Sequence, residues 1–173
     1  MTQMRIRYVC SDQEQETDAA LTDAATLAIG AGMRLTGTVQ PVDGDNRAEK
    51  CHIILALLPD GERCDISLPL EPGMTGCRLD AGALEDVAVQ VQDRLPDAQC
   101  LLVNKFGKQE AVGRGLVTAI GEACERGLPV VVGVSPQWLA AFQDFAGDAA
   151  EPLPADASVI VNWLDDACGA SAA

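Results

Sequence analysis

The sequence is poor in the residue types that most often carry nucleophilic catalysis and nucleobase stacking. Its 173 residues include one histidine, three lysines and only 3% aromatic residues. A Ser/His/Asp or Cys/His site would therefore have a single candidate base, His52, which lies in a predicted strand. Because there are so few aromatic side chains, few residues are available to stack on exposed bases or sugars. We expect no catalytic residue of these kinds.

Positive charge is also scarce. Lys and Arg total 12 against 26 Asp and Glu, for a formal net charge of −14. Such an acidic surface repels phosphate backbones and anionic lipid headgroups, so general nucleic-acid binding is not expected. The longest apolar runs, 53–58 and 130–134, have the length of a strand and not of a membrane span. No apolar segment of signal-peptide length follows the N-terminus, so we expect a cytoplasmic protein that does not insert into a membrane.

The cysteines show no pattern typical of a metal site or a disulfide framework. There are seven, an odd number, and none are in C-x-x-C spacing. Cys51 and His52 are adjacent, so in a strand they point to opposite faces and would not bind one ion together. We expect reduced, mostly buried thiols and no bound metal.

Apolar runs alternate with helical periodicity along most of the chain, which predicts an α/β fold with a mainly parallel sheet flanked by helices. The turn at Asp60-Gly61 predicts a β-hairpin insertion over 51–68. Residues 1–154 are expected to form a single domain, to which a C-terminal helix and tail, 155–173, also belong. Strands are predicted at 5–10, 34–40, 51–58, 63–68, 100–104 and 129–134, and helices at 11–31, 80–95, 109–126, 135–145 and 158–167.

The loop after the first strand is where a phosphate-binding loop would lie in such a sheet. Residues 10–18 contain no glycine and no lysine, and they carry carboxylates at 12, 14, 16 and 18. Ser11 and Glu14 have capping-box spacing, which favours a well-capped helix start with Ser11 as N-cap. A divalent cation bridging the carboxylates is the alternative.

A second segment concentrates cations in this acidic chain. Asn104, Lys105 and Lys108 follow a buried strand, and the loop predicted at 105–108 opens a helix. Lysines beside free backbone N–H groups attract anions, so we expect an anion-binding site here. Arg114 is a further candidate ligand, although its spacing from Glu110 also suits an ion pair within a helix.

Arg78 is the remaining candidate. It lies just before the helix that Asp80 is predicted to cap, and from a neighbouring loop its guanidinium could join an oxyanion site. The alternative is a surface arginine that pairs with Asp80 or another carboxylate.

Three segments, 76–80, 101–111 and 113–116, together resemble an uncharacterised bacterial DUF family whose genes accompany molybdate uptake systems. The resemblance runs from the first strand to about Pro154. It implies a role in molybdate or tungstate handling.

That family is in turn distantly similar to P-loop nucleoside-triphosphatases of the thermostable type, which implies a P-loop-NTPase-like sheet. There the equivalent strand ends in an Asp-Glu-Ile-Gly-Lys-Met-Glu pattern. This chain keeps Gly107, Lys108 and Glu110 but has Asn104 and Lys105 where the acidic pair would hold magnesium and orient water. It also lacks a Walker A loop. Both departures remove parts that phosphoryl transfer needs, so we expect no such activity.

The sequence therefore favours a non-catalytic accessory or binding protein whose ligand is a small oxyanion, molybdate or tungstate, with no other cofactor. Its site would comprise Asn104, Lys105, Lys108, Arg78 and Arg114. Molybdenum-transport or cofactor-pathway proteins are the expected partners, and homo-oligomer formation stays open. Two alternatives remain: a divergent nucleotide-binding NTPase-like enzyme, and a regulatory protein-interaction module.

Overall fold

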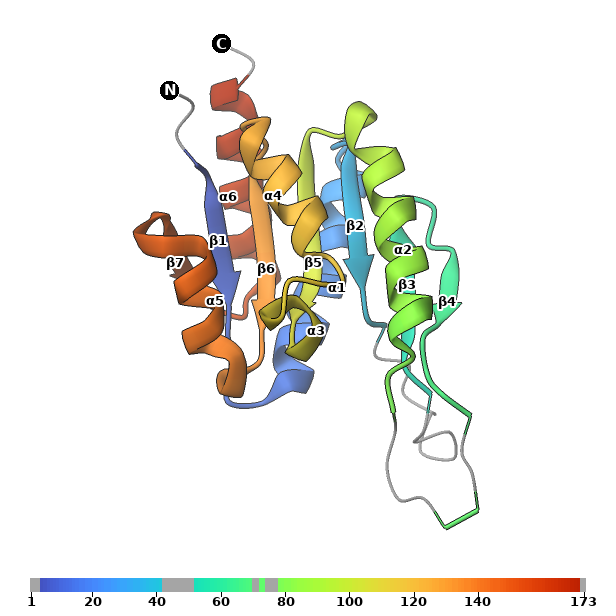
Figure 1. Cartoon of the computed structure of the whole chain (residues 1–173). Helices are drawn as coiled ribbons and strands as arrows, with labels where there is room; N and C mark the ends of the chain where they lie inside the picture. The colour runs from blue at the N-terminus through green and yellow to red at the C-terminus, as the bar shows by residue number, and fades with distance from the viewer. Residues whose placement is uncertain (1–3, 42–51, 70–71, 74–77, 172–173) are drawn as a thin grey trace.

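A computed structural model of the chain describes residues 4–41, 52–69, 72–73 and 78–171. Its centre is a seven-stranded sheet in the order β4-β3-β2-β5-β6-β1-β7 (Figure 1). Strands β2, β5, β6, β1 and β7 pair in parallel, and β3 and β4 complete one edge antiparallel. The strands span Ile6–Val9 (β1), Leu35–Val39 (β2), Ile54–Leu58 (β3), Arg63–Asp65 (β4), Cys100–Phe106 (β5), Val130–Val134 (β6) and Ala150–Leu153 (β7).

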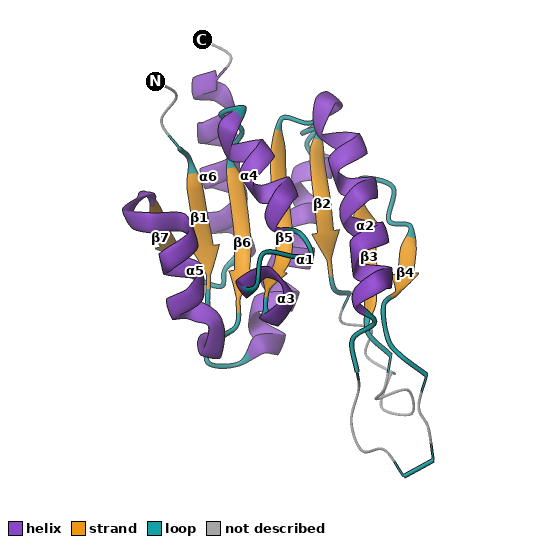
Figure 2. Ribbon diagram, viewed as in Figure 1, coloured by secondary structure: helices purple, strands orange, loops and turns teal. Residues whose placement is uncertain are grey.

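Helices cover both faces of the sheet (Figure 2). One face carries α1 (Glu14–Gly30) and α6 (Ala157–Ser171), and the other carries α2 (Ala81–Arg94), α3 (Lys108–Ala111), α4 (Val117–Glu125) and α5 (Leu139–Ala146). Short 3-10 helices span Leu95–Asp97, Pro136–Trp138 and Gly147–Ala149. None of the helices in these ranges has both the length and the apolar character needed to cross a membrane.

The central strands are buried on both sides, which explains their nearly continuous apolar sequences. All five residues of β6 are buried, and Phe106 of β5 packs edge-to-face on Phe142 of α5 with ring centroids 5.3 Å apart. Behind the sheet, Ile160 and Leu164 of α6 join Leu21 of α1 in a second apolar cluster. The predicted α/β class is confirmed.

The antiparallel hairpin and its flanking helix also follow the sequence. Leu55 pairs with Cys64 across the hairpin, and Gly61 takes φ +79° in the turn, a conformation that favours glycine. Asp80 caps α2 by accepting a hydrogen bond from the N–H of Ala83 at 3.1 Å. The part of the predicted insertion at residue 51 lies outside the described residues.

The predicted N-cap at Ser11 is wrong, and Ser135, where the helix over 135–145 is predicted to begin, is not a side-chain cap either. Helix α1 begins at Glu14, and Ser11 Oγ donates to Glu16 at 2.8 Å and accepts from the N–H of Gln13 at 3.3 Å. Ser11 thus ties the loop before the helix to the Glu16 side chain but caps no backbone N–H of the first turn. Ser135 makes no side-chain cap, because a 3-10 turn at Pro136–Trp138 precedes α5.

The predicted helix over 109–126 is interrupted. Helix α3 ends at Ala111 and α4 begins at Val117, with Gly113 at φ +84° and Gly115 at φ +61° between them. These left-handed glycines turn the chain out of the helical path. Strand β5 also runs two residues further than predicted, through Lys105 and Phe106, because Phe106 is drawn into the core.

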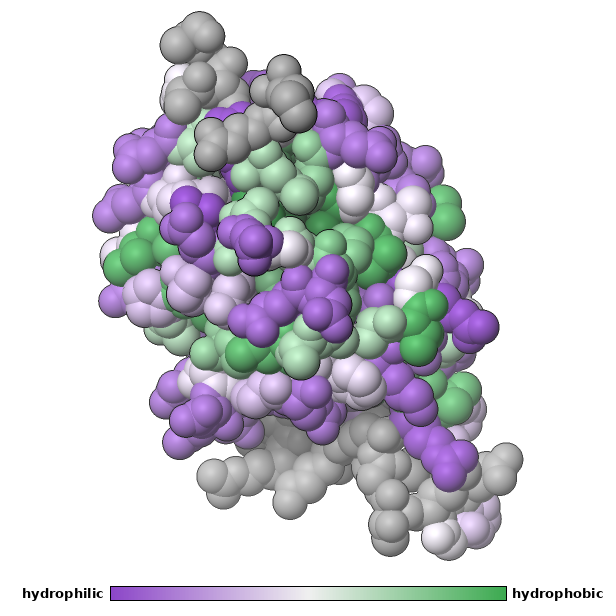
Figure 3. All heavy atoms as spheres, turned by 60° about the vertical axis from the view of Figure 1, so that its left-hand side comes forward, coloured by the Kyte–Doolittle hydropathy of each residue, from purple (hydrophilic) through white to green (hydrophobic). Residues whose placement is uncertain are grey.

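Strand β7 was not predicted, since 147–157 has the composition of a linker. It pairs in parallel with β1, and Arg7 of β1 forms an ion pair with Glu151 of β7 at 3.5 Å. The Arg7 guanidinium also lies 5.1 Å from the centre of the Trp163 ring. Figure 3 turns this side of the molecule forward and shows hydrophobic side chains in the middle, surrounded and interrupted by hydrophilic ones.

Candidate functional site

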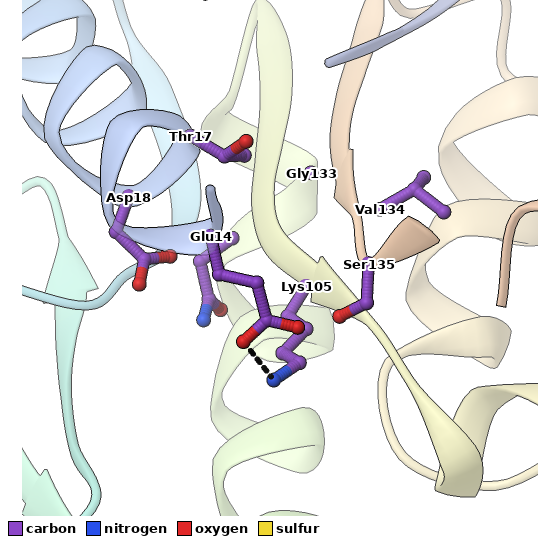
Figure 4. Close-up of a pocket in the computed structure, with 8 residues that line it drawn as sticks. Glu14, Thr17, Asp18, Lys105, Gly133, Val134 and Ser135 are labelled. Carbon is purple, nitrogen blue, oxygen red and sulfur yellow. Dashed lines mark ion pairs between the residues drawn. The ribbon is translucent and has the colours of Figure 1, made fainter. Parts of the chain in front are cut away.

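The parallel strands present their carboxyl ends at one edge of the sheet, where ligands bind in open α/β folds (Figure 1). Helix α1 begins at this edge, directly after β1. Figure 4 shows a pocket where Glu14 and Asp18 of α1 face Lys105 of β5 and Ser135 after β6. Its free volume is about 10 Å³, room for about one water.

One ion pair crosses this α1 pocket, which holds two carboxylates and one lysine. The ammonium group of Lys105 lies 3.5 Å from the carboxylate of Glu14, and both side chains are about half exposed, at 45% and 52%. The pKa of Asp18 is raised to about 6, chiefly by burial; Lys105 opposes this shift and Glu14 adds to it. The place of a Walker A loop is thus taken by two carboxylates and one lysine.

Asn104 is fixed by the neighbouring strand. Its Oδ1 accepts a 2.7 Å hydrogen bond from Thr38 Oγ1 of β2, and both residues are buried. Gly133 of β6 lies against the same residue, where a Cβ would overlap the carbonyl oxygen of Asn104. The end of β5 is therefore held between its two neighbours, and Asn104 stands in a fixed position.

A larger cavity of about 290 Å³ opens beside Lys105, between the hairpin, α2 and α3. We call it the carboxyl-edge cavity. One part of its wall is polar and carries two lysines, several amides and one carboxylate; the other part is apolar. The polar wall comprises Gln40, Asn104, Lys105, Lys108, Gln109, Glu110 and Gln137, and the apolar wall comprises Ile53, Leu55, Ile66, Leu79, Leu84 and Leu116, with Gly107 and Trp138 completing it.

Glu110 holds the interrupted helix in shape. Its buried carboxylate accepts hydrogen bonds from the N–H groups of Gly107 at 3.1 Å and Leu116 at 3.4 Å. Burial raises its pKa, and these two bonds oppose the shift. A Cβ on Gly115 would stand 2.5 Å from Glu110 Oε1, so the glycine allows this close approach. The ion pair considered between Glu110 and Arg114 does not form: Arg114 is exposed beyond the end of α3, and the Glu110 carboxylate is buried on backbone N–H groups.

Three of the five predicted ligands, Asn104, Lys105 and Lys108, line the carboxyl-edge cavity. Arg78 and Arg114 are exposed and lie outside its wall. The carbonyl of Arg78 accepts from the N–H of Leu68 at 2.7 Å, which ties this segment to the chain after the hairpin.

The amides of the wall, Gln40, Gln109 and Gln137, were not predicted. A survey of polar residues just past each strand end would have found Gln40 and Gln137.

No cluster of three or more His, Cys, Asp or Glu side chains able to hold a metal occurs among the described residues. Cys10, Cys64, Cys100, Cys124 and Cys168 are free thiols, and Cys51 and Cys77 lie outside the described residues. Burial raises the pKa of Cys124 to about 11, so this thiol is poorly reactive near neutral pH.

Comparison with known proteins places the chain in a family. The sequence profile described as "Protein of unknown function (DUF2478)" matches residues 6–163. The chain belongs to the DUF2478 family. A curated relative, "Molybdenum import ATP-binding protein ModC 2" of Bradyrhizobium diazoefficiens, is 31% identical over 163 residues. The match covers 94% of this chain but only 18% of that protein's length.

Solved structures share the fold of this DUF2478 protein. THEP1 from Aquifex aeolicus superposes with a TM-score of 0.60 at 11% identity, covering 94% of this chain and 95% of its own. A human cancer-related nucleoside triphosphatase gives 0.59 at 12% identity, covering 96% and 97%. The predicted P-loop-NTPase-like architecture is therefore confirmed. At 11% and 12% identity, the likeness concerns the fold alone.

Proposed function

We propose that this DUF2478 protein is a non-catalytic binding protein for a small oxyanion of the molybdate or tungstate class, acting in the cytoplasm as an accessory to molybdenum handling. The observation that carries the proposal is the shared position of Lys105 and Lys108, with Asn104, in the wall of one cavity at the carboxyl edge of the sheet.

Electrostatics supports an anionic ligand. The chain has three lysines and a net charge of −14, yet two of those lysines meet at this cavity. Lysine ammonium groups and glutamine amides both donate hydrogen bonds to oxyanion oxygens, and the lysines add charge. The ion pair between Lys105 and Glu14 is half exposed, so an incoming anion can compete for Lys105 at little cost.

The start of α1 supports binding without hydrolysis. Phosphoryl transfer in P-loop enzymes uses glycine-rich backbone and a lysine to cradle phosphates, and acidic residues to hold magnesium. Here Glu14 and Glu16 occupy the first helical turn, the α1 pocket has room for about one water, and Asn104 and Lys105 lie near the end of β5.

The molybdenum link rests on the relative, which its name describes as a molybdenum import ATP-binding protein. On the same basis we propose molybdenum-transport proteins as the physiological partners of this chain. The second candidate, a nucleotide-binding protein, is favoured by the fold shared with a nucleoside triphosphatase over 96% of this chain.

Isothermal titration calorimetry with molybdate, tungstate, sulfate, phosphate and Mg-ATP separates these functions. We expect the wild type to bind an oxyanion and the double variant Lys105→Ala/Lys108→Ala to lose that binding, with the fold intact because both side chains are exposed. Arg114→Ala is the matched control, an exposed cation outside the cavity wall, and should bind like the wild type.

Saturation should also raise the unfolding free energy, by about 2.7 kcal/mol at a hundred times the Kd. Tight binding of Mg-ATP alone would favour the nucleotide function. Binding of none of these anions at millimolar concentration would refute the oxyanion proposal and favour a protein-interaction module.

A further inference from the structure

Two cysteines that are far apart in the sequence meet where the C-terminal helix packs on the sheet. Cys100 begins β5, and Cys168 lies on the buried face of α6 that also carries Ile160 and Leu164. The Cys168 thiol donates a hydrogen bond to the carbonyl of Gln99, the residue directly before Cys100, at 3.8 Å. The two thiols are also hydrogen-bonded to each other, and both are free. The fold therefore holds two sulfur atoms side by side.

The backbone on both sides of this thiol pair is anchored. Beside one cysteine, the carbonyl of Ala167 accepts a hydrogen bond from the guanidinium of Arg5, just before β1. Beside the other, the N–H of Arg34 donates to Gln99 Oε1 at 2.9 Å, and the N–H of Gln99 donates to the Arg34 carbonyl at 2.7 Å. The position of the two sulfurs thus follows from contacts of the sheet and of α6, and not from one side-chain rotamer.

The two thiols differ in acidity. The hydrogen bond from Cys100 holds the pKa of Cys168 below its usual value; burial opposes this shift, and the Arg5 and Arg34 guanidinium groups add to it, against Asp165. The same hydrogen bond, with burial, raises the pKa of Cys100. Burial raises the pKa of the other described thiols, Cys10, Cys64 and Cys124. Because the thiolate is the nucleophile, Cys168 is the thiol of this pair that reacts first.

We propose that Cys168 and Cys100 form a reversible dithiol site that a small-molecule disulfide, such as glutathione disulfide, oxidises. The Cys168 thiolate attacks one sulfur of the small disulfide, forms a mixed disulfide and releases one small thiolate. Cys100 then loses its proton, attacks the Cys168 sulfur and releases the second small thiol. Two protein thiols become one disulfide while one small disulfide becomes two thiols, so the electrons balance. This site goes beyond the anion-binding function and does not depend on it.

The product would join α6 covalently to β5. Cys168 is 9% exposed near the end of the helix and Cys100 is fully buried, so the small disulfide meets Cys168 first. The new bond closes a loop of about 70 residues, which restricts the unfolded chain more than the folded one. Oxidation should therefore raise the melting temperature, by about 5–10 °C for a chain of this size.

Peptide mapping of the native protein tests the proposal directly. The protein is incubated with glutathione disulfide or with hydroxyethyl disulfide, which is uncharged and so is not repelled by the acidic chain; the remaining thiols are then blocked with iodoacetamide. Trypsin cuts after Arg94, Lys105 and Arg126, which leaves Cys100 and Cys168 as the single cysteines of two peptides, 95–105 and 127–173. We expect mass spectrometry to find these peptides joined, and dithiothreitol to reverse both the cross-link and the rise in melting temperature.

Three variants test the role of each thiol. Cys100→Ala should stop the reaction at the mixed disulfide on Cys168, because the second thiol is missing. Cys168→Ala should leave Cys100 reduced. Cys124→Ala removes a partly buried thiol elsewhere in the same fold, and it should form the cross-link as the wild type does. In the wild type, Cys168 should react at least about tenfold faster than Cys124, whose pKa is about 11.

The contrary outcomes are equally specific. The proposal is overturned if Cys100 and Cys168 stay reduced in the native protein with both small disulfides, or if their cross-link forms only in denaturant. If Cys100 forms the mixed disulfide in Cys168→Ala as fast as Cys168 does in Cys100→Ala, the assigned order of reaction is wrong. Mapping of the wild type needs no substitution, so the test stays decisive even where a variant fails to fold.

Discussion

Lys105 and Glu14 form an ion pair, 3.5 Å apart, that joins the end of β5 to the first turn of α1. The pair lies between the small α1 pocket and the carboxyl-edge cavity, and Lys105 lines both. The lysine is therefore shared between a resident carboxylate and any anion that enters the cavity.

Removal of this competing carboxylate should strengthen anion binding. We expect Glu14→Gln to raise the affinity for molybdate by about two- to fivefold, since an exposed ion pair contributes at most about 1 kcal/mol. The gain should shrink as salt is added, because salt screens exposed charges. Calorimetry at low and high ionic strength measures both effects. Glu16→Gln is the control: it removes the same charge from the same helical turn, and an equal gain there would show that only net charge matters.

Asp18 should make the stability of the protein pH-dependent. Its pKa is raised from 3.8 to about 6 by burial, so the folded state binds more protons than the unfolded state between these values. The unfolding free energy should therefore fall as pH rises from about 4 to about 6. Asp18→Asn removes this penalty and should stabilise the protein by roughly 1–2 kcal/mol at about pH 8, after allowance for partial exposure, and hardly at all at about pH 4.

Urea unfolding at the two pH values measures this difference. Asp23→Asn, an exposed change on the same helix, reports the effect of net charge alone. If Asp18→Asn stabilises equally at both pH values, the titration assigned to Asp18 is wrong.

The buried hydrogen bond between Thr38 and Asn104 should contribute measurably to stability. Thr38→Val keeps the shape of the side chain but leaves Asn104 Oδ1 without its donor, which should cost about 1–3 kcal/mol. Thr36→Val is the matched control on the same strand. Thr36 Oγ1 donates at 3.4 Å to the carbonyl of Leu58, which keeps a 3.0 Å bond from Arg94 when the threonine is replaced. Chemical denaturation measures the unfolding free energy of both variants. An equal decrease for Thr38→Val and Thr36→Val would contradict the prediction.

The protein should not hydrolyse nucleoside triphosphates at an enzyme-like rate. The start of α1 holds carboxylates where a phosphate cradle would be, and β5 carries Asn104 and Lys105 near its end. Typical enzymes turn over at about 1 to 1,000 per second. Phosphate release from Mg-ATP and Mg-GTP should stay below this range; release within it that Lys108→Ala abolishes would show an active enzyme.

The fold was predictable because its periodic signals are strong and local. The helical spacing of the apolar residues Leu84, Val87, Val91 and Leu95 predicts α2 and the side of it that is buried. The Asp60-Gly61 turn predicts the hairpin. Strand β7 carried no such signal, since it is four residues long and its partner β1 lies more than a hundred residues earlier in the chain. Only tertiary pairing makes it a strand.

The candidate site was predictable in part. Lys105 and Lys108 are close together in the sequence near the end of a buried strand, which predicts a site there. Both line the cavity. The arginines could not be placed in the same way. The position of Arg114 depends on the interruption of the helix at Gly113 and Gly115. The helical spacing of apolar residues such as Leu116 and Ile120 predicts a continuous helix instead. The amides Gln40 and Gln137 follow strand ends in the sequence. That they line the same cavity depends on which strands are neighbours in the sheet.

The position of β1 has a consequence for how the protein is made. This strand is synthesised more than a hundred residues before its neighbours in the sheet, β6 and β7, at 130–134 and 150–153. Its hydrogen-bonding edges thus stay unpaired until β6 and β7 have been made. At synthesis rates of about 5–20 residues per second, the wait lasts on the order of 10 seconds. The nascent chain must keep this unpaired strand from wrong partners for that time.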